Sequence, residues 1–282
     1  RPKSSAASDV YKRQQDELEK VKKQVRSGLA NTPTSPGEIA GNLVSATNFG
    51  SLHPYGEVMT EETLENISRQ DLVKYHKTYF RPNAAYLIVV GDITPDEAYA
   101  KANAHFGNWY RGDIPYTRIM PAKFPTGNQV RFAAVEGAVQ STINITQPVP
   151  FPPGHPDAAA IQLMNSILGG GAFSGRLMQN LREDKAFTYG ARCSLSADPV
   201  TAQFIAYADV RSEVTDSALV EFMAEIHRIR NEQVDSAELA TAKAFLSGSF
   251  ARSLENEGTV ARFALNIERY DLPEDHYQTY LQ

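Results

Sequence analysis

An arginine and a tyrosine follow a run of three glycines, and these residue types together could bind a ligand. In the stretch LGGGAFSGRLMQNLREDKAFTYGA (168–191), Arg182 lies seven residues before Tyr189. The glycine run is Gly169, Gly170 and Gly171. The stretch can be interpreted as a phosphate cradle, as a plain turn between helices, or as part of a peptide-binding cleft.

The phosphate interpretation disagrees with the spacing. A dinucleotide-binding fingerprint needs G-x-G-x-x-G after a strand, but the residue three positions after Gly171 is Ser174, and the preceding segment has helical periodicity. A P-loop needs Lys and then Ser or Thr after its last glycine, whereas Gly175 is followed by Arg176. We therefore expect no nucleotide site here.

The plain-turn interpretation explains most of the stretch. One helix ends at a glycine, Ser174 caps the next helix, and that helix turns three apolar residues toward the core, namely Leu177, Met178 and Leu181. It does not explain three glycines where one would suffice. Glycines in series let another backbone approach closely, at an entropic cost, so a binding role for this loop stays open.

Arg182 and Tyr189 also have two interpretations. On one continuous helix, a spacing of seven would place them on the same face, about 10 Å apart. The sequence Phe-Thr-Tyr-Gly favours extended structure, however, so we expect the helix to end near Lys185 and Tyr189 to open a strand beside it. In that arrangement Arg182 could pair with Glu183 or Asp184 in a purely structural role.

The composition excludes several classes of protein. The 282 residues are 42% hydrophobic and 22% charged, which is ordinary for a globular chain of one large or two modest domains. A net charge of -5 with scattered Lys and Arg argues against nucleic-acid binding. The longest apolar stretch, YLIVV (86–90), is too short to span a membrane. Cys193 is the single cysteine and no two histidines are spaced four apart, so we assign no metal ligand.

The chain contains an internal repeat. A shift of 221 positions aligns residues 17–30 with 238–251, and residues 37–49 with 258–270. Repeats of this kind indicate duplicated domains. We therefore expect the back part of one copy and most of the next.

Periodicity and turn residues predict the elements that position the glycine-arginine-tyrosine stretch. Helices are expected at 16–30, 37–49, 68–80, 94–109, 155–170, 215–232, 236–253 and 257–269. Strands are expected at 84–91, at 129–136 paired with 140–149, and at 190–200 paired with 201–211 around Asp198 and Pro199. Strands and helices are segregated along the chain, which indicates the α+β class.

The sequence also resembles a known family. The run GGGAFSGRLMQNLREDKAFTYG and the upstream run HPYGEVMTEETLENISRQDLVKYHKTYFRPNAAYLIVVGDI resemble the insulinase and pitrilysin family of zinc metallopeptidases, which includes mitochondrial processing peptidase and its bacterial relatives. The resemblance implies homologous α+β domains with mainly antiparallel sheets that close like a clamshell. Residues 1–14 have no apolar run and no periodicity, so we expect a foreign or disordered lead-in there. The rest divides into the C-terminal part of a first peptidase-like domain (15–112), a linker (113–128) and a second such domain truncated at its C-terminus (129–282).

The resemblance also implies roles for individual residues. In this family one half-shell carries an inverted zinc motif, His-x-x-Glu-His, with a distant Glu as third ligand, and the other half-shell supplies an Arg and a Tyr. By motif position, Arg182 and Tyr189 would hydrogen-bond the substrate carbonyl or the oxyanion across the cleft. Substrate contacts along an extended peptide would come from Gly169, Gly170, Gly171 and Ser174. The position of the third ligand reads VRSG (25–28), so zinc is expected in a partner domain or subunit and not in this chain.

The function implied is the substrate-binding part of an insulinase-family zinc metallopeptidase. It would bind peptide or unfolded polypeptide and contribute to peptide bond hydrolysis as a heterodimer with a zinc-bearing homologous subunit, without a cofactor of its own. The alternative is a non-catalytic scaffold or assembly protein that retains the peptidase fold. The family suggests the bacterial periplasm or envelope, while the residues themselves specify no compartment.

Overall fold

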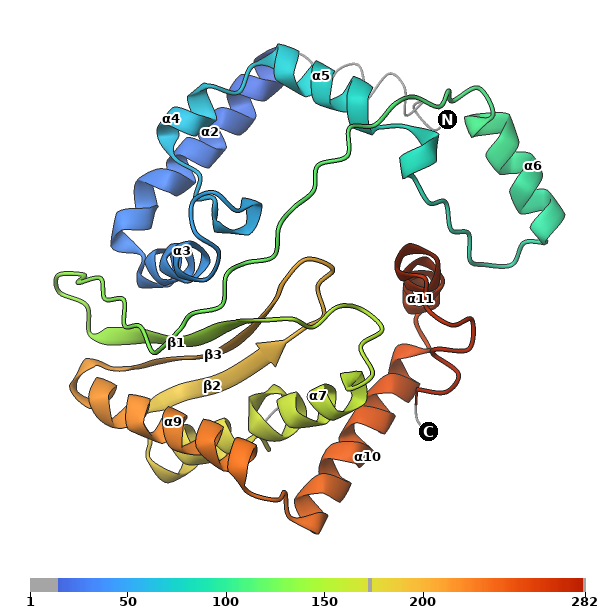
Figure 1. The fold of residues 1–282 in the computed structure, drawn as a ribbon. Coiled ribbons are helices and arrows are strands. Elements are labelled where there is room, and N and C mark those ends of the chain that lie inside the picture. Colours follow the sequence, from blue (N-terminus) through green and yellow to red (C-terminus); the bar gives the residue numbers. More distant parts are fainter. Residues whose placement is uncertain (1–14, 172–173, 281–282) are drawn as a thin grey trace. The chain divides into compact units, whose positions relative to one another are not determined.

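The computed structural model describes residues 15–171 and 174–280, which divide into two units (Figure 1). The lead-in expected at 1–14 lies outside the described residues. The first unit consists of the described residues through Ser35 together with Val58–Arg118. The second unit consists of Pro36–Glu57 and the chain from Ile119 onward. Residues 36–57 therefore belong to the second unit although they precede most of the first along the chain.

The regular secondary structure in the described residues of the first unit is helical. Its helices are α2 (Gln15–Asn31), α4 (Glu61–Glu65), α5 (Arg69–Tyr79) and α6 (Pro95–Phe106). Ser68 and Asp71 each bond the other's backbone N–H at the start of α5, and Thr94 and Glu97 do the same at α6. These capping boxes satisfy donors that the first turn leaves without partners. The helices expected in this unit are confirmed, except that α6 ends at Phe106, before the expected residue.

The strand expected at 84–91 does not form. The segment has no ladder partner, because the described residues of the first unit contain no strand to satisfy its N–H and C=O groups. Four of its apolar side chains are 41 to 58% exposed, namely Tyr86, Leu87, Val89 and Val90, and Ile88 is half-buried. Among the apolar side chains described in this unit, only Leu64 is buried. The described part of the first unit thus lacks a hydrophobic core of its own.

The second unit is built around an antiparallel sheet. Its described strands are β1 (Gln140–Val149), β2 (Thr188–Leu195) and β3 (Ala202–Arg211), in the order β1-β3-β2. β1 and β3 pair along their whole length, from Gln140 opposite Arg211 to Val149 opposite Ala202. β2 and β3 form the expected hairpin, and in its turn the carboxylate of Asp198 accepts the N–H groups of Val200 and Thr201.

The expected pairing of 129–136 with 140–149 is wrong. Gly137 turns the chain with a φ of +75°, but 129–136 forms no ladder with any described residue. Val130 and Phe132 are 86% and 87% exposed. The partner of β1 is β3, and that pairing buries Ile143 opposite Ala208 on the core face of the sheet.

Helices cover both faces of this sheet (Figure 1). On one face, α8 (Arg176–Met178) and α9 (Thr215–Asn231) pack against the strands, and Leu177 and Phe222 are fully buried together with Val210. On the other face, α3 (Pro36–Phe49) packs against β1, where Asn48 Nδ2 donates to Thr146 Oγ1 at 2.6 Å. The segment 36–57 is therefore an integral part of the second unit.

Three further α-helices of the second unit lie in its described residues, namely α7 (Ala158–Asn165), α10 (Ser236–Ser253) and α11 (Glu257–Tyr270). The last two repeat a pattern seen earlier in the chain. α2 and α10 begin at Gln15 and Ser236, and α3 and α11 begin at Pro36 and Glu257, which is the same offset in both pairs. Helices combined with a small antiparallel sheet confirm the α+β class, while the duplicated clamshell stays a prediction.

Two further expectations concern the linker and membrane-spanning segments. The expected linker, residues 113–128, contains neither helix nor strand. In the described part of the chain, no helix combines the length and the apolar character needed to cross a membrane.

Candidate functional site

Arg182 and Tyr189 lie side by side in the second unit. Arg182 is on a π-helical segment, η5 (Gln179–Asp184), that continues α8, and Tyr189 is in β2. The guanidinium carbon of Arg182 lies 4.9 Å from the centroid of the Tyr189 ring, within the range of a cation–π interaction. Tyr189 is 87% exposed and the Arg182 side chain 28% exposed, so a ligand can reach both. Arg182 Nε also lies 3.4 Å from Glu183 Oε1, the ion pair that a structural role predicts.

A left-handed residue ends the helix and turns the chain into β2. Ala186 has a φ of +52°, a conformation that costs a residue with a Cβ about 1–2 kcal/mol. Its N–H donates to Arg182 O at 3.0 Å, and Phe187 N–H donates to Leu181 O at 2.8 Å. These bonds satisfy carbonyls of the last helical turn. The expected helix end near Lys185 is therefore confirmed, and Tyr189 follows a few residues later.

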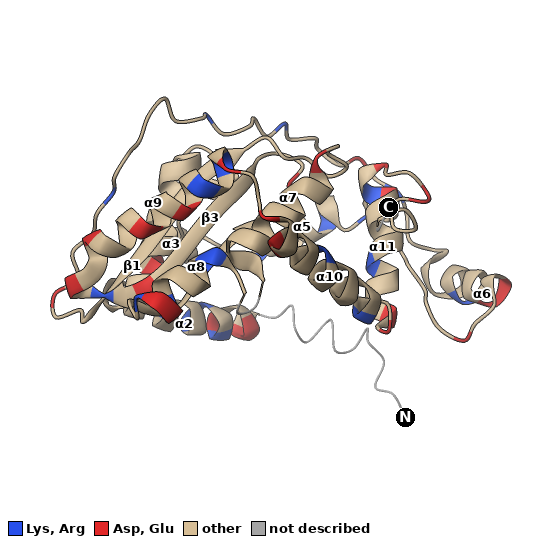
Figure 2. Ribbon diagram, turned by 90° about the horizontal axis from the view of Figure 1, so that it is seen from below, with Lys and Arg blue, Asp and Glu red and all other residues tan. Residues whose placement is uncertain are grey.

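Carboxylates on α9 and α10 hold the helix that carries Arg182. Arg176 donates from Nε and Nη2 to the two carboxylate oxygens of Glu238 in α10, at 2.7 and 2.6 Å, and Arg176 is only 6% exposed. Asn180 Nδ2 donates to Glu225 Oε1 in α9 at 3.0 Å, and Figure 2 shows both acidic and basic positions on that helix. The hydrogen bonds from Arg176 hold the pKa of the Glu238 carboxyl below its usual value, so this pair is charged at neutral pH.

Sequence reasoning missed Arg176. Its partner lies 62 residues further along the chain, and no local spacing relates the two residues. The one available signal was an arginine directly after a glycine in a segment expected to face the core, because a buried arginine needs a carboxylate partner.

All three glycines of the run are required by close packing of the chain on itself. A Cβ on Gly169 would lie 2.8 Å from Cys193 N and 3.1 Å from Arg192 C, so the backbone that approaches this glycine is β2. On Gly170 and Gly171 a Cβ would lie 2.9 Å from a carbonyl oxygen of the preceding turn. That turn is π-helical, η4 (Ser166–Gly170). Gly169 and Gly171 are buried, and only Gly170 is exposed to solvent.

The expected cap at Ser174 is wrong. The N-cap residue of α8 is Gly175, which has no side chain to cap the helix. Gly175 occupies this position because a Cβ on it would lie 2.8 Å from Gly169 Cα. Ser174 is exposed, so its side chain remains available to a ligand.

A pocket borders the glycine turn in the second unit. Its volume is about 540 Å³, and it is lined by Ser166 and Gly170, by Phe245 of α10, and by Tyr270 and the following segment. Arg182 and Tyr189 are not among its lining residues. The structure thus brings Arg182 and Tyr189 together and places Gly170 at a separate pocket.

The described residues offer no metal centre. Among them, no group of three or more His, Cys, Asp and Glu side chains is placed to hold a metal ion. Where the resemblance expects a third zinc ligand, α2 carries Arg26, whose guanidinium pairs with the carboxylates of Glu61 and Glu65. Burial raises the pKa of the Cys193 thiol to about 12, so this thiol stays protonated at neutral pH and is not a nucleophile.

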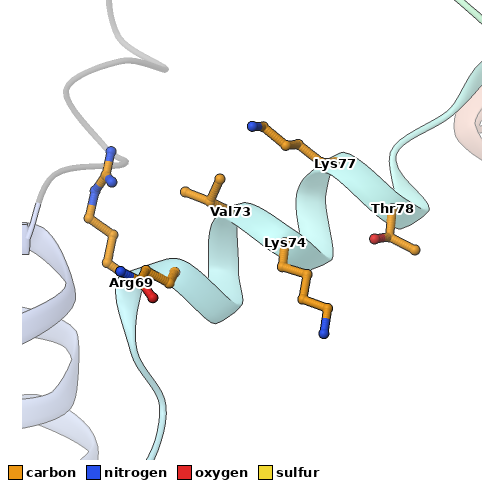
Figure 3. Close-up of a pocket in the computed structure, with 6 residues that line it drawn as sticks. Arg69, Val73, Lys74, Lys77 and Thr78 are labelled. Atoms are coloured by element: carbon orange, nitrogen blue, oxygen red, sulfur yellow. The ribbon is translucent and has the colours of Figure 1, made fainter.

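A second hollow lies along α5 in the first unit (Figure 3). As far as the described residues go, this one helix supplies its whole lining, which is Arg69, Gln70, Val73, Lys74, Lys77 and Thr78. Ligand sites usually need polar groups that converge from several elements. We therefore do not treat this hollow as a candidate site.

Comparison with known proteins identifies a family that matches the part of the chain containing Arg182 and Tyr189. The profile of the family described as "Peptidase M16 inactive domain" matches residues 66–246, more than half of the chain. An uncharacterized zinc protease of Bacillus subtilis (strain 168), YmxG, is 25% identical over 244 residues, which cover 86% of this chain and 58% of that protein. The human mitochondrial-processing peptidase subunit beta is 24% identical over 157 residues, which cover 54% of this chain and 31% of that protein.

A solved structure shares the fold. The peptidase M16 inactive domain from Pseudomonas fluorescens matches with a TM-score of 0.84 and 23% identity, covering 95% of this chain and 64% of that chain. The present chain therefore spans less than two thirds of each of these proteins. Because the family profile covers residues 66–246, including the helix and strand that carry Arg182 and Tyr189, the chain belongs to the family of peptidase M16 inactive domains.

Proposed function

We propose that this chain is the substrate-binding part of a zinc metallopeptidase, in which Arg182 and Tyr189 contact the bound polypeptide. The described residues contain no candidate metal site, so the peptide bond would be hydrolysed at zinc held by another domain or by a homologous partner subunit. Arg182 and Tyr189 would donate hydrogen bonds to a substrate carbonyl or to the oxyanion that forms on it.

The contact between Arg182 and Tyr189 carries this proposal. They come from different elements, and the guanidinium carbon lies 4.9 Å from the ring centroid. A tyrosine that serves only packing is largely buried, whereas Tyr189 is 87% exposed. The contact with the Arg182 guanidinium favours this position of the ring, and positioned donors of this kind can stabilise a transition state.

The relatives support a second domain or subunit. One of them is by name a subunit of a processing peptidase. We infer that residues 15–112 form the C-terminal part of a first peptidase-like domain, which contributes its segment 36–57 to the second unit, and that 129–282 belong to a second domain. Two features of the described part of the first unit support this inference: Tyr86, Leu87, Val89 and Val90 are exposed, and Leu64 is the one buried apolar residue there. A helical layer of this kind needs a sheet to cover it.

Reconstitution tests the proposal. The full chain is mixed with a zinc-bearing homologous subunit, and cleavage of fluorescein-labelled casein is measured. Cleavage should require both chains, and Arg182→Ala should lower kcat/KM on the order of a hundredfold, the usual effect of removing one oxyanion donor. The matched control is Arg252→Ala, which removes an exposed arginine of α10 and should leave cleavage unchanged.

Two outcomes would contradict the proposal. Wild-type rates in both Arg182→Ala and Tyr189→Phe would remove the role of these side chains. A full chain that binds the zinc-bearing subunit but not casein would instead favour a scaffold protein that retains the peptidase fold.

A further inference from the structure

The strand that carries Tyr189 contains one extra residue. Between β2 and β3, Ala191 pairs with Ala208 and the rest of β2 keeps the same register, but Thr188 pairs with Val210 where that register requires Arg211. Two residues of β2, Tyr189 and Gly190, therefore lie where β3 has one. This is a β-bulge, a feature that locally re-aims side chains.

The bulge decides which way Tyr189 points. Ala191 and Cys193 face the core, at 0% and 5% exposed. Unbroken alternation would put Tyr189 on the same face, opposite Val210, which is fully buried. With the bulge, Thr188 takes the place opposite Val210, and Tyr189 is exposed beside Arg182.

The hydroxyl of Thr188 closes the bulge. Thr188 Oγ1 accepts the N–H of Gly190 at 3.1 Å and donates to the carbonyl oxygen of Asp209 at 2.6 Å. A bulge takes an N–H group out of the strand ladder, so this hydroxyl supplies the bond that β3 does not. Gly190 does not fix the bulge sterically, because a Cβ there would have only ordinary contact with Met178 Cε at 3.8 Å.

We propose that Thr188 is the positioning residue of Tyr189: its hydroxyl holds the bulge that presents the Tyr189 ring to Arg182 and to a bound polypeptide. The consequence for polypeptide binding rests on the proposed function. The consequence for the exposure of Tyr189 does not, and it can be measured without any ligand.

Nitration of the full chain by tetranitromethane, read by mass spectrometry, reports the exposure of each tyrosine. Tyr207 of β3, 43% exposed, serves as the internal reference. Thr188→Val keeps the shape of the side chain and removes the hydroxyl, and it should lower Tyr189 nitration relative to Tyr207 on the order of fivefold. Thr188→Ser retains the hydroxyl and should nitrate like wild type.

The matched control is Thr142→Val. Thr142 lies on β1 and donates its hydroxyl to the carboxylate of Asp209, Oδ1, at 2.6 Å, whereas Thr188 donates to the backbone carbonyl of the same residue. This variant therefore removes the same group on the β1 side of β3 and leaves the hydrogen bonds of Thr188 in place. It should leave Tyr189 nitration unchanged. Wild-type nitration of Tyr189 in a folded Thr188→Val chain would overturn the proposal.

Two further measurements cover a Thr188→Val chain that does not fold and separate this proposal from the proposed function. Should Thr188→Val fail to fold, hydrogen exchange of the wild-type chain decides, since the Gly190 amide must exchange slowly and rapid exchange would contradict its bond to Thr188. Binding of fluorescein-labelled casein to Tyr189→Ala tests the proposed function separately. If that variant binds casein as wild type does, the proposed function fails while the nitration result for Thr188 still stands.

Discussion

Replacing Gly169 by alanine would show whether the glycine run exists because the chain packs against itself. The new Cβ would lie 2.8 Å from Cys193 N, 3.1 Å from Arg192 C and 3.0 Å from Leu177 Cδ1. Two of these atoms are backbone of β2, which is held on β3, so they cannot rotate away. Over-packing of a filled site costs about 1–3 kcal/mol. At a urea slope of about 2 kcal/mol per M, the unfolding midpoint should fall by roughly 1 M.

Urea unfolding followed by far-UV circular dichroism measures this effect. The control is Gly190→Ala, where the added Cβ would meet only Met178 Cε at an ordinary 3.8 Å. That variant should stay within about 0.5 kcal/mol of wild type. In hydrogen exchange, the β2 amides of Gly169→Ala should exchange faster than those of wild type, and those of Gly190→Ala should not. Equal midpoints for the two variants would refute the packing argument and leave the glycines to be explained by a ligand.

Three further predictions concern neighbouring residues. Ala186→Gly should raise the free energy of unfolding by about 0.5–1 kcal/mol, because glycine adopts the φ of +52° without strain; a lower urea midpoint would contradict this. The folded-state pKa of Glu238 is lowered by Arg176, so the stabilisation is present above the usual Glu pKa of about 4.3 and is lost as the pH falls through the folded value. The stability difference between wild type and Glu238→Gln should therefore shrink in acid, and a constant difference would count against the pair. Cys193 is 5% exposed and should resist iodoacetamide at about pH 8 until urea unfolds the chain, so rapid labelling of the folded chain would show that its burial is wrong.

Features fixed by neighbouring residues could be predicted from the sequence. The start of α5 depends on Ser68 and Asp71, three positions apart, and the hairpin turn depends on Asp198 bonding residues just after it. The end of the helix near Lys185 followed from the β-forming residues after it. That helix end, together with the strand that opens at Tyr189, is what brings the tyrosine beside Arg182.

Features that depend on distant residues could not be predicted. The alternation in 140–149 indicates a strand but not its partner, and the partner in the structure, β3, shares the core face through Ala208 and lies about 60 residues further along the chain. The partner of Arg176 lies in α10, and the backbone that requires Gly169 lies in β2. No residue type around Thr188 marks a β-bulge, so the sequence did not predict the bulge or the outward direction of Tyr189.

The most direct test of the central claim is a double-mutant cycle on casein binding. Affinity for fluorescein-labelled casein is measured by anisotropy for the full chain with Arg182→Ala, with Tyr189→Phe and with both changes. Two side chains that touch each other and the same polypeptide should each weaken binding, and the double variant should lose less than the sum of the single losses. Wild-type affinity in all three variants would contradict the claim that Arg182 and Tyr189 form a polypeptide-binding site.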